Sequence, residues 1–269
     1  MLGAGWTQIV ALAAAYVIAA LATPAGVSGA VLLLPFQVSV LGTPSPAVTP
    51  TNLLYNVVAT PGALYRYRQQ GQTGGRLAFL LAGGTLPGVV AGSIIRVEFL
   101  PGPRVFDLVV AGVLLPLGVW LAASRRQPAG SEDVRDPVRA VRLIPDPALL
   151  VLAAAVGCVG GIYGIGGGSI LAPILIGSGR SPADVAPAAL ASTFLTSVAG
   201  VITFTALSIN HHGSIAPDWT TGIALGLGGL AGAYTGARIQ SRLPELAIRR
   251  LVGVLVIAIA ARYLWSGVG

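Results

Sequence analysis

Apolar stretches, most of them nearly long enough to cross a lipid bilayer as a helix, recur along the whole chain of 269 residues. An α-helix needs about 20 mostly apolar residues to cross the hydrocarbon core of a membrane. Only 9% of the residues are charged, whereas a soluble domain carries about 25%. The pattern predicts an all-α integral membrane protein, a polytopic helical bundle embedded in a lipid bilayer. The predicted helices lie at 6–23, 30–41, 51–67, 77–97, 105–124, 148–163, 169–176, 188–209, 219–237 and 246–265.

Two of these stretches, 30–41 and 169–176, are too short to cross a bilayer. A helix over 30–41 would be about 18 Å long at about 1.5 Å per residue, and the hydrocarbon core is about 30 Å thick. We therefore expect both to be short broken or re-entrant helices, which leaves about eight full spans. The first stretch lacks the positively charged start of a signal peptide, so we expect a retained membrane helix.

The charges and the metal-binding residue types exclude several classes of protein. The sequence contains no lysine, which excludes a P-loop nucleotide-binding motif. The net charge of +7 comes from arginines in short loops; membrane orientation explains them, and we expect no nucleic-acid partner. Cys158 is the only cysteine, and the adjacent His211 and His212 have no carboxylate cluster beside them. We expect no metal site and no cofactor.

The two halves of the chain resemble each other. The segment "GVSGAVLLLP" ends at Pro35 and "GIGGGSILAP" ends at Pro173, and further matches follow in the same order at a spacing near 140 residues. Between the halves, "RRQPAGSEDVRDPVRAVRLIPD" is the one long polar stretch. The sequence predicts a first membrane repeat at 1–124, a cytoplasmic linker at 125–146 and a second membrane repeat at 147–269.

The arginines predict that the two repeats are inverted. Arg66, Arg68 and Arg76 bracket the loop after the third stretch, whereas the matching loop "NHHGSIAPD" has none. The next loop reverses this contrast: the second half carries Arg238, Arg242, Arg249 and Arg250, and the first half carries Arg96, Arg104 and Glu98. Arginine-rich loops face the cytoplasm. Opposite insertion is typical of inverted-repeat secondary transporters, and five segments per half place both termini outside.

Glycines mark a break before each short helix. Gly164, Gly166, Gly167 and Gly168 precede Ser169 in the second half, and Gly26, Ser28 and Gly29 occupy the same place in the first. Non-helical backbone at membrane depth survives only where it is buried in protein or lines a wet cavity. The free amides and the dipole at a helix start attract an anion. We therefore predict a substrate site at these residues; the alternative is close helix packing, as expected for Gly228 and Gly229.

Polar side chains inside apolar stretches extend the predicted site. Asn52, Asn56 and Thr60 share one helical face because they lie four residues apart. The equivalent stretch of the second half contains Ser192, Thr193, Thr196 and Ser197. Such groups should face the bundle interior because burying them in lipid is costly. We place Asn52, Asn56 and Thr193 in the substrate site; hydrogen bonding between helices is the alternative.

The segments "GGIYGIGGGSILAPIL" and "TNLLYNVVATPGALYRY" resemble the signature segments of the sulfite exporter TauE/SafE family. The resemblance covers nearly the whole chain, including the duplicated halves and the charged linker. The first-half copy of the glycine motif departs from it at Ala25, Val27 and Ala30. The resemblance implies a transporter of small sulfur-containing anions, such as sulfite or organosulfonates, in the bacterial inner membrane.

These observations predict a secondary transporter of a small anion with no enzymatic activity. The alternative is an integral membrane enzyme or an assembly subunit, for which His211, His212 and Asp218 are the only nearby titratable cluster. Asp107 is the single carboxylate clearly inside an apolar stretch, and we expect it at the membrane interface. The transported anion, the direction, the coupling ion and the oligomeric state, a homo-oligomer included, are left open by the sequence.

Overall fold

The computed structural model describes residues 4–23, 28–44, 46–100, 144–178, 180, 182–210 and 215–239, and scattered helical residues between 108 and 123 and between 250 and 265. These residues form helices and connecting turns and contain no strand, which confirms the predicted all-α class. Several predictions fall outside the described residues: those for Gly26, Asp107, His211, His212, most of the linker 125–146 and most of the stretches 105–124 and 246–265.

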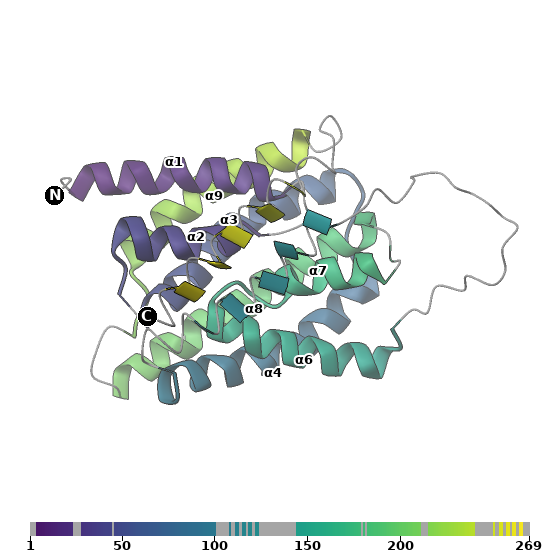
Figure 1. The fold of residues 1–269 in the computed structure, drawn as a ribbon. Helices are drawn as coiled ribbons and strands as arrows, with labels where there is room; N and C mark the ends of the chain where they lie inside the picture. The colour runs from purple at the N-terminus through teal and green to yellow at the C-terminus, as the bar shows by residue number, and fades with distance from the viewer. Residues whose placement is uncertain are drawn as a thin grey trace, which may run out of the picture.

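The observed helices follow the predicted stretches closely (Figure 1). By length and composition, four segments of the described helices could cross a membrane: Gly5–Ala22, Gly75–Glu98, Asp146–Tyr163 and Asp184–Asn210. Helix α8 begins six residues before the predicted start because Pro182, which lacks an amide hydrogen, is tolerated in a first turn. The elements are α1 (Ala4–Ala22), α2 (Ala30–Phe36), the π-helical turn η2 (Gln37–Leu41), α3 (Val48–Gln69), α4 (Gly75–Glu98), α6 (Asp146–Tyr163), α7 (Gly168–Gly177), α8 (Pro182–Asn210) and α9 (Trp219–Ile239).

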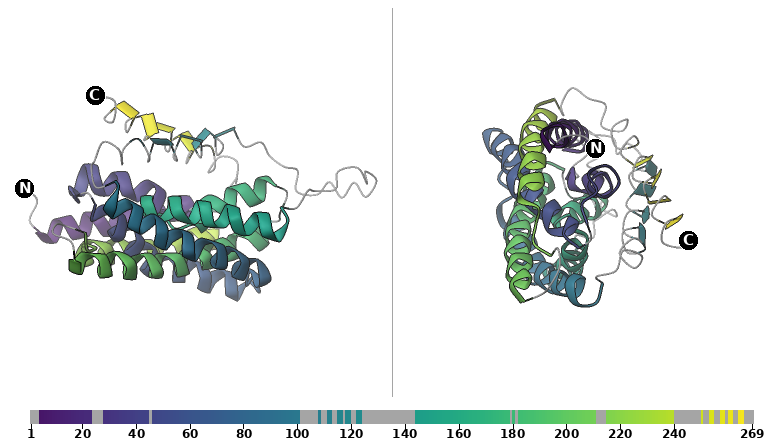
Figure 2. Two further views of the ribbon diagram at one scale, coloured as in Figure 1. Left: turned by 90° about the horizontal axis from the view of Figure 1, so that it is seen from below. Right: turned by 90° about the vertical axis from the view of Figure 1, so that its left-hand side faces the viewer.

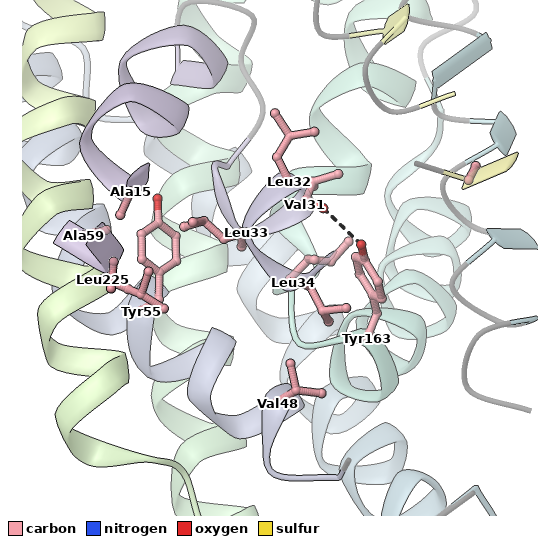
Figure 3. Packing of buried hydrophobic residues seen from close by; sticks show 14 of the residues in the cluster. Ala15, Val31, Leu32, Leu33, Leu34, Val48, Tyr55, Ala59, Tyr163 and Leu225 are labelled. Atoms are coloured by element: carbon pink, nitrogen blue, oxygen red, sulfur yellow. Dashed lines mark hydrogen bonds between the residues drawn. The ribbon is translucent and has the colours of Figure 1, made fainter. Parts of the chain in front are cut away.

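Helix α2 is short and enclosed by other helices, as predicted for 30–41. Figure 3 shows its side chains between Tyr55 of α3 and Tyr163 of α6. Pro35 lies inside α2 and has no amide hydrogen to offer the carbonyl four residues earlier, that of Val31. The Tyr163 hydroxyl donates to this carbonyl at 3.0 Å. A side chain of the second half thus satisfies the backbone of the broken helix in the first.

Two helix pairs form opposite sides of the bundle, α1 with α9 and α4 with α6 (Figures 1 and 2). Glycines allow the close approach in both pairs. Gly228 and Gly232 of α9 lie against the backbone of Leu12 and Tyr16 in α1. Gly88 and Gly92 of α4 lie in the same way against Ala154 and Cys158 of α6. Residue numbers rise together along both pairs, so the two helices of each pair run parallel. The close packing predicted at Gly228 and Gly229 is observed.

The remaining contacts relate the directions of α3 and α8 to these two pairs. Helices α3 and α9 run parallel, because Leu54 lies against Gly222 and Val58 against Gly226. Helix α8 runs parallel to α4, with Ser192 at Thr85 and Gly200 at Val89. Helices α3 and α8 cross in opposite directions, since Leu53 meets Gly200 while Tyr67 clusters with Ala186. Thus α1, α3 and α9 run one way and α4, α6 and α8 the other, as two inverted halves predict.

These directions place five arginines at one end of the bundle. The ends of α3 and α9 and the starts of α4 and α8 lie together there, with Arg66, Arg68, Arg76, Arg180 and Arg238. Arg76 forms an ion pair of 2.6 Å with Asp146 at the start of α6. Arg96 at the end of α4 lies at the opposite end of the bundle and is fully buried.

Candidate functional site

The glycine run between α6 and α7 forms an unwound turn. Gly164 caps α6 with a φ of +83°, and Gly166 has a φ of +70°. Side chains with a Cβ rarely adopt such angles, so glycine is required at both positions. Residues 164 to 168 are all buried. The structure therefore contains the predicted non-helical backbone, buried inside the bundle.

The same turn is closely packed against α3 and α8. A Cβ at Gly164 would lie 2.5 Å from the carbonyl oxygen of Thr49. One at Gly168 would overlap the carbonyl oxygen of Ala189 and lie 2.5 Å from the Thr193 hydroxyl. The turn is therefore unwound, as predicted, and also closely packed, as the alternative interpretation expects.

Three buried hydroxyls on α4 and α8 have no hydrogen-bond partner among the described residues. They belong to Ser93 of α4 and to Thr193 and Ser197 of α8. Other hydroxyls nearby are paired: Ser192 lies 2.8 Å from Thr85 Oγ1, and Ser169 donates to the Ile165 carbonyl at 3.2 Å. An unpaired buried hydroxyl costs about 1–3 kcal/mol, so these three positions favour an occupant that supplies the missing bonds.

The side-chain amide of Asn56, beside the break before α2, has one unpaired end. The Ala30 amide donates to Ser28 Oγ at 3.2 Å, and the Ser28 hydroxyl donates to Asn56 Oδ1 at 2.7 Å. This pairing identifies the acceptor end of the Asn56 side chain. Its other end, Nδ2, is buried without a partner in the described part of the chain. Because Nδ2 only donates, an acceptor such as an anion oxygen fits beside it.

Asn52 has a different environment, although it lies on the same helical face. Its Nδ2 donates to the Ala30 carbonyl at 2.9 Å, and its Oδ1 accepts from Gln37 Nε2 at 3.0 Å. Both ends of this amide are therefore engaged in holding α2 and η2 against α3. Asn52 thus positions neighbouring elements, whereas Asn56 keeps an unpaired Nδ2 within the described residues.

A small cavity lies next to the first break. Its volume of about 20 Å³ has room for about one water molecule. Gly29 leaves space for the Tyr55 hydroxyl, which lies 2.5 Å from where a Cβ would be. The lining residues are Thr23, Ser28, Gly29, Tyr55, Ala59, Thr60, Ala63, Tyr67, Ala186, Leu190 and Ala233.

The two breaks face equivalent polar pairs. Asn56 and Thr60 of α3 lie four residues apart beside the first break. Thr193 and Ser197 of α8 lie four residues apart beside Gly166 at the second. The structure thus brings Ser28, Gly29 and Asn56 together at one break, and Gly164, Gly166, Gly167, Gly168, Ser169 and Thr193 at the other.

Sequence reasoning missed the role of Arg96, which it assigned to a loop. The side chain is fully buried, and its Nε lies 3.4 Å from the Thr49 hydroxyl. Its guanidinium also donates to the Leu100 carbonyl. The Thr49 hydroxyl in turn lies 3.3 Å from the Ile162 carbonyl near the end of α6. The only sequence sign of this network is an arginine within the apolar run "SIIRVEF".

The unpaired groups beside the two breaks are not hydrogen-bonded to any described carboxylate. Glu98, Asp146, Asp184 and Asp218 all lie at or beside helix ends. No group of three histidine, cysteine or acidic side chains suited to a metal occurs among the residues that the structure describes. Within these residues the unpaired groups beside the breaks are therefore neutral hydroxyl and amide groups.

The model of the sulfite exporter TauE/SafE family matches residues 11–263. The chain belongs to this family. A "Probable membrane transporter protein" of Xylella fastidiosa (strain 9a5c) is 27% identical over 89% of this chain and 88% of its own length. The "Probable membrane transporter protein y4hK" of Sinorhizobium fredii is 26% identical over 96% of this chain and 99% of its own. No solved structure matches the chain.

Membership of the TauE/SafE family confirms the resemblance seen in the sequence and identifies the chain as a multi-pass membrane transporter. The match spans both halves, so both breaks lie within the shared architecture. The short helices α2 and α7 are thus parts of a transporter, and their unpaired donors are candidates for substrate contact.

Proposed function

We propose that this TauE/SafE protein is a secondary transporter that moves a small sulfur-containing anion, such as sulfite or an organosulfonate, across the bacterial cytoplasmic membrane. The observation that carries the proposal is the set of unpaired buried groups beside the breaks, Asn56 Nδ2 and the hydroxyls of Thr193 and Ser197. Asn56 and Thr193 occupy equivalent positions on α3 and α8, which cross each other in the bundle.

The chemistry of these groups favours an anion over a cation. Hydroxyls can donate or accept, but the Asn56 amide nitrogen only donates. The start of α7 adds amides without an intrahelical acceptor and the positive end of a helix dipole. The unpaired side-chain groups form no hydrogen bond with a carboxylate in the described part of the chain. The sulfur in the substrate is supported by the family description, which names a sulfite exporter.

The observed conformation is too tight to hold the anion in the cavity. Space for about one water molecule is less than a sulfite ion needs. Binding therefore requires the cavity walls to separate, as alternating access provides in inverted-repeat transporters. The site is predicted to form between the breaks when these helices move.

The arginines support an orientation for the proposed transporter. The end with Arg66, Arg68, Arg76, Arg180 and Arg238 would face the cytoplasm. The linker 125–146 would then be cytoplasmic and join repeats at 1–124 and 147–269, with both termini outside. The cavity, lined by Tyr67 near the end of α3 and by Ala186 near the start of α8, lies towards the cytoplasmic end.

A flux screen with purified protein in liposomes tests the proposal. The anions are sulfite, sulfate, thiosulfate, methanesulfonate and acetate, with protein-free liposomes as the control. We expect saturable uptake of at least one sulfur anion well above acetate. Equal leakage of all five anions with and without protein would contradict the transport function. Saturable uptake of acetate alone would overturn the substrate class and leave anion transport standing.

A further inference from the structure

The residues that line the cavity beside the first break have counterparts in the second half of the chain. Aligning Pro50 of α3 with Pro187 of α8 pairs Thr60 with Ser197 and Ala186 with Thr49. Aligning Gly92 of α4 with Gly232 of α9 pairs Ala233 with Ser93. Thr60, Ala186 and Ala233 line the cavity. Their counterparts are therefore the residues that would line a cavity related to the first by the pseudo-two-fold axis of the repeats.

These counterparts surround the glycine turn and are closed off in the present structure. Ser197 Oγ lies 3.2 Å from the Cβ position of Gly166, and the Ser93 amide nitrogen lies 3.1 Å from that of Gly161. Thr49 packs on Gly164. Leu53 lies against Gly200, and these two residues are the counterparts of Leu190 and Ala63 in the cavity lining. The position equivalent to the cavity in the second half is thus filled by side chains.

The closed position carries hydroxyls at two places where the cavity carries alanine. Ala186 and Ala233 in the cavity correspond to Thr49 and Ser93, which carry hydroxyls. The hydroxyls of Ser93 and Ser197 are buried without a partner among the described residues. Unpaired buried hydroxyls are unfavourable, and water or an anion reaching this position would remove that cost.

We propose that Ser93, Ser197 and Thr49 line a second cavity, which opens at the end of the protein opposite the first and forms the other access path of the anion. The inference rests on the proposed function, because inverted repeats achieve alternating access by exchanging the roles of their halves. The contact of Arg96 with Thr49, and that of Thr49 with the Ile162 carbonyl, seal this cavity in the present state. When the seal opens, the Arg96 guanidinium lies at the mouth and attracts the passing anion.

Site-directed labelling tests the second cavity. The parent variant is Cys158→Ala, because Cys158 is the only native thiol. Single Ser93→Cys and Ala233→Cys variants are treated with a membrane-impermeant sulfonated maleimide, in intact cells and in inside-out vesicles. We expect Ser93→Cys to react from one face of the membrane only and Ala233→Cys from the other. Reaction of both variants from the same face, or no reaction of Ser93→Cys from either face, would overturn the proposal.

A Thr49→Val substitution in the same variants tests the seal. Loss of its hydrogen bonds should raise the labelling rate of Ser93→Cys roughly three- to tenfold. Labelling of Ala233→Cys should fall, because opening one side closes the other. A merely loosened protein would raise both rates, which would contradict the proposal. Rates that do not change would show that Thr49 seals nothing.

Labelling needs no substrate, so its failure is distinguishable from failure of the proposed function. A protein that moves methanesulfonate into liposomes but never exposes Ser93→Cys would keep its transport function and lose this access path. Opposite-face labelling without flux of any tested anion would keep the two cavities and contradict the proposed anion transport.

Discussion

Ser197→Ala separates a ligand-binding hydroxyl from a structural one, because the two roles change stability in opposite directions. The Ser197 hydroxyl is fully buried and unpaired within the described residues. Removing it ends a desolvation cost of about 1–3 kcal/mol without breaking a bond. We therefore expect Ser197→Ala to unfold at a higher temperature than the wild type.

The same change should weaken substrate binding. A hydrogen bond to a charged group contributes about 1.5–3 kcal/mol, and each 1.4 kcal/mol is a factor of ten in the dissociation constant. Affinity for the anion moved best in liposomes should therefore fall roughly 10- to 150-fold. Thermal unfolding in detergent and equilibrium binding on the same sample measure both quantities.

Ser192→Ala is the matched control on the same helix. Ser192 is also fully buried, but its hydroxyl pairs with Thr85 at 2.8 Å. Losing this bond should lower stability by about 0.5–1.5 kcal/mol and leave affinity unchanged. If Ser197→Ala is stabilised and still binds like the wild type, its hydroxyl does not contact the substrate and the reasoning is refuted.

Three further changes test other parts of the structure. Asn52→Ala should lower stability by about 1–3 kcal/mol for each of the two partners it leaves unpaired, Ala30 and Gln37, while the folded fraction keeps its affinity; lost affinity at unchanged stability would return Asn52 to the binding site. Gly228→Ala drives a Cβ into the Leu12 carbonyl and should cost about 1–3 kcal/mol of stability in a thermal melt without changing affinity; a normal melt would show that α1 and α9 are not packed this closely. Gln70→Cys and Phe99→Cys should label from opposite faces of the membrane, and labelling from one face would contradict the direction of α4.

The fold was largely predictable because bilayer thickness limits helix length. The apolar run 30–41 predicted the extent of α2 and η2, and the glycines before α7 predicted the non-helical backbone in which Gly164 and Gly166 have positive φ angles. The inverted halves followed from the contrast of arginines between matching loops. These properties depend on local composition, which a sequence displays directly.

The contacts of the site depend on packing between distant segments. Asn52 and Asn56 share a helical face, and only the position of α2 makes Asn52 structural and leaves Asn56 Nδ2 unpaired. Arg96 resembles an interfacial charge in the sequence, and its burial arises because Thr49 at the start of α3 packs beside it. Partners far apart in the chain decide both roles.

Asn56→Asp tests the central claim that the site binds an anion. An aspartate keeps the acceptor for the Ser28 hydroxyl and replaces the unpaired Nδ2 with negative charge. Flux of the best-moved sulfur anion into liposomes is measured for this variant and the wild type between pH 6 and 9. We predict a flux that falls well below the wild type as rising pH ionises the new carboxyl. Flux equal to the wild type across the whole range would contradict an anion site at Asn56.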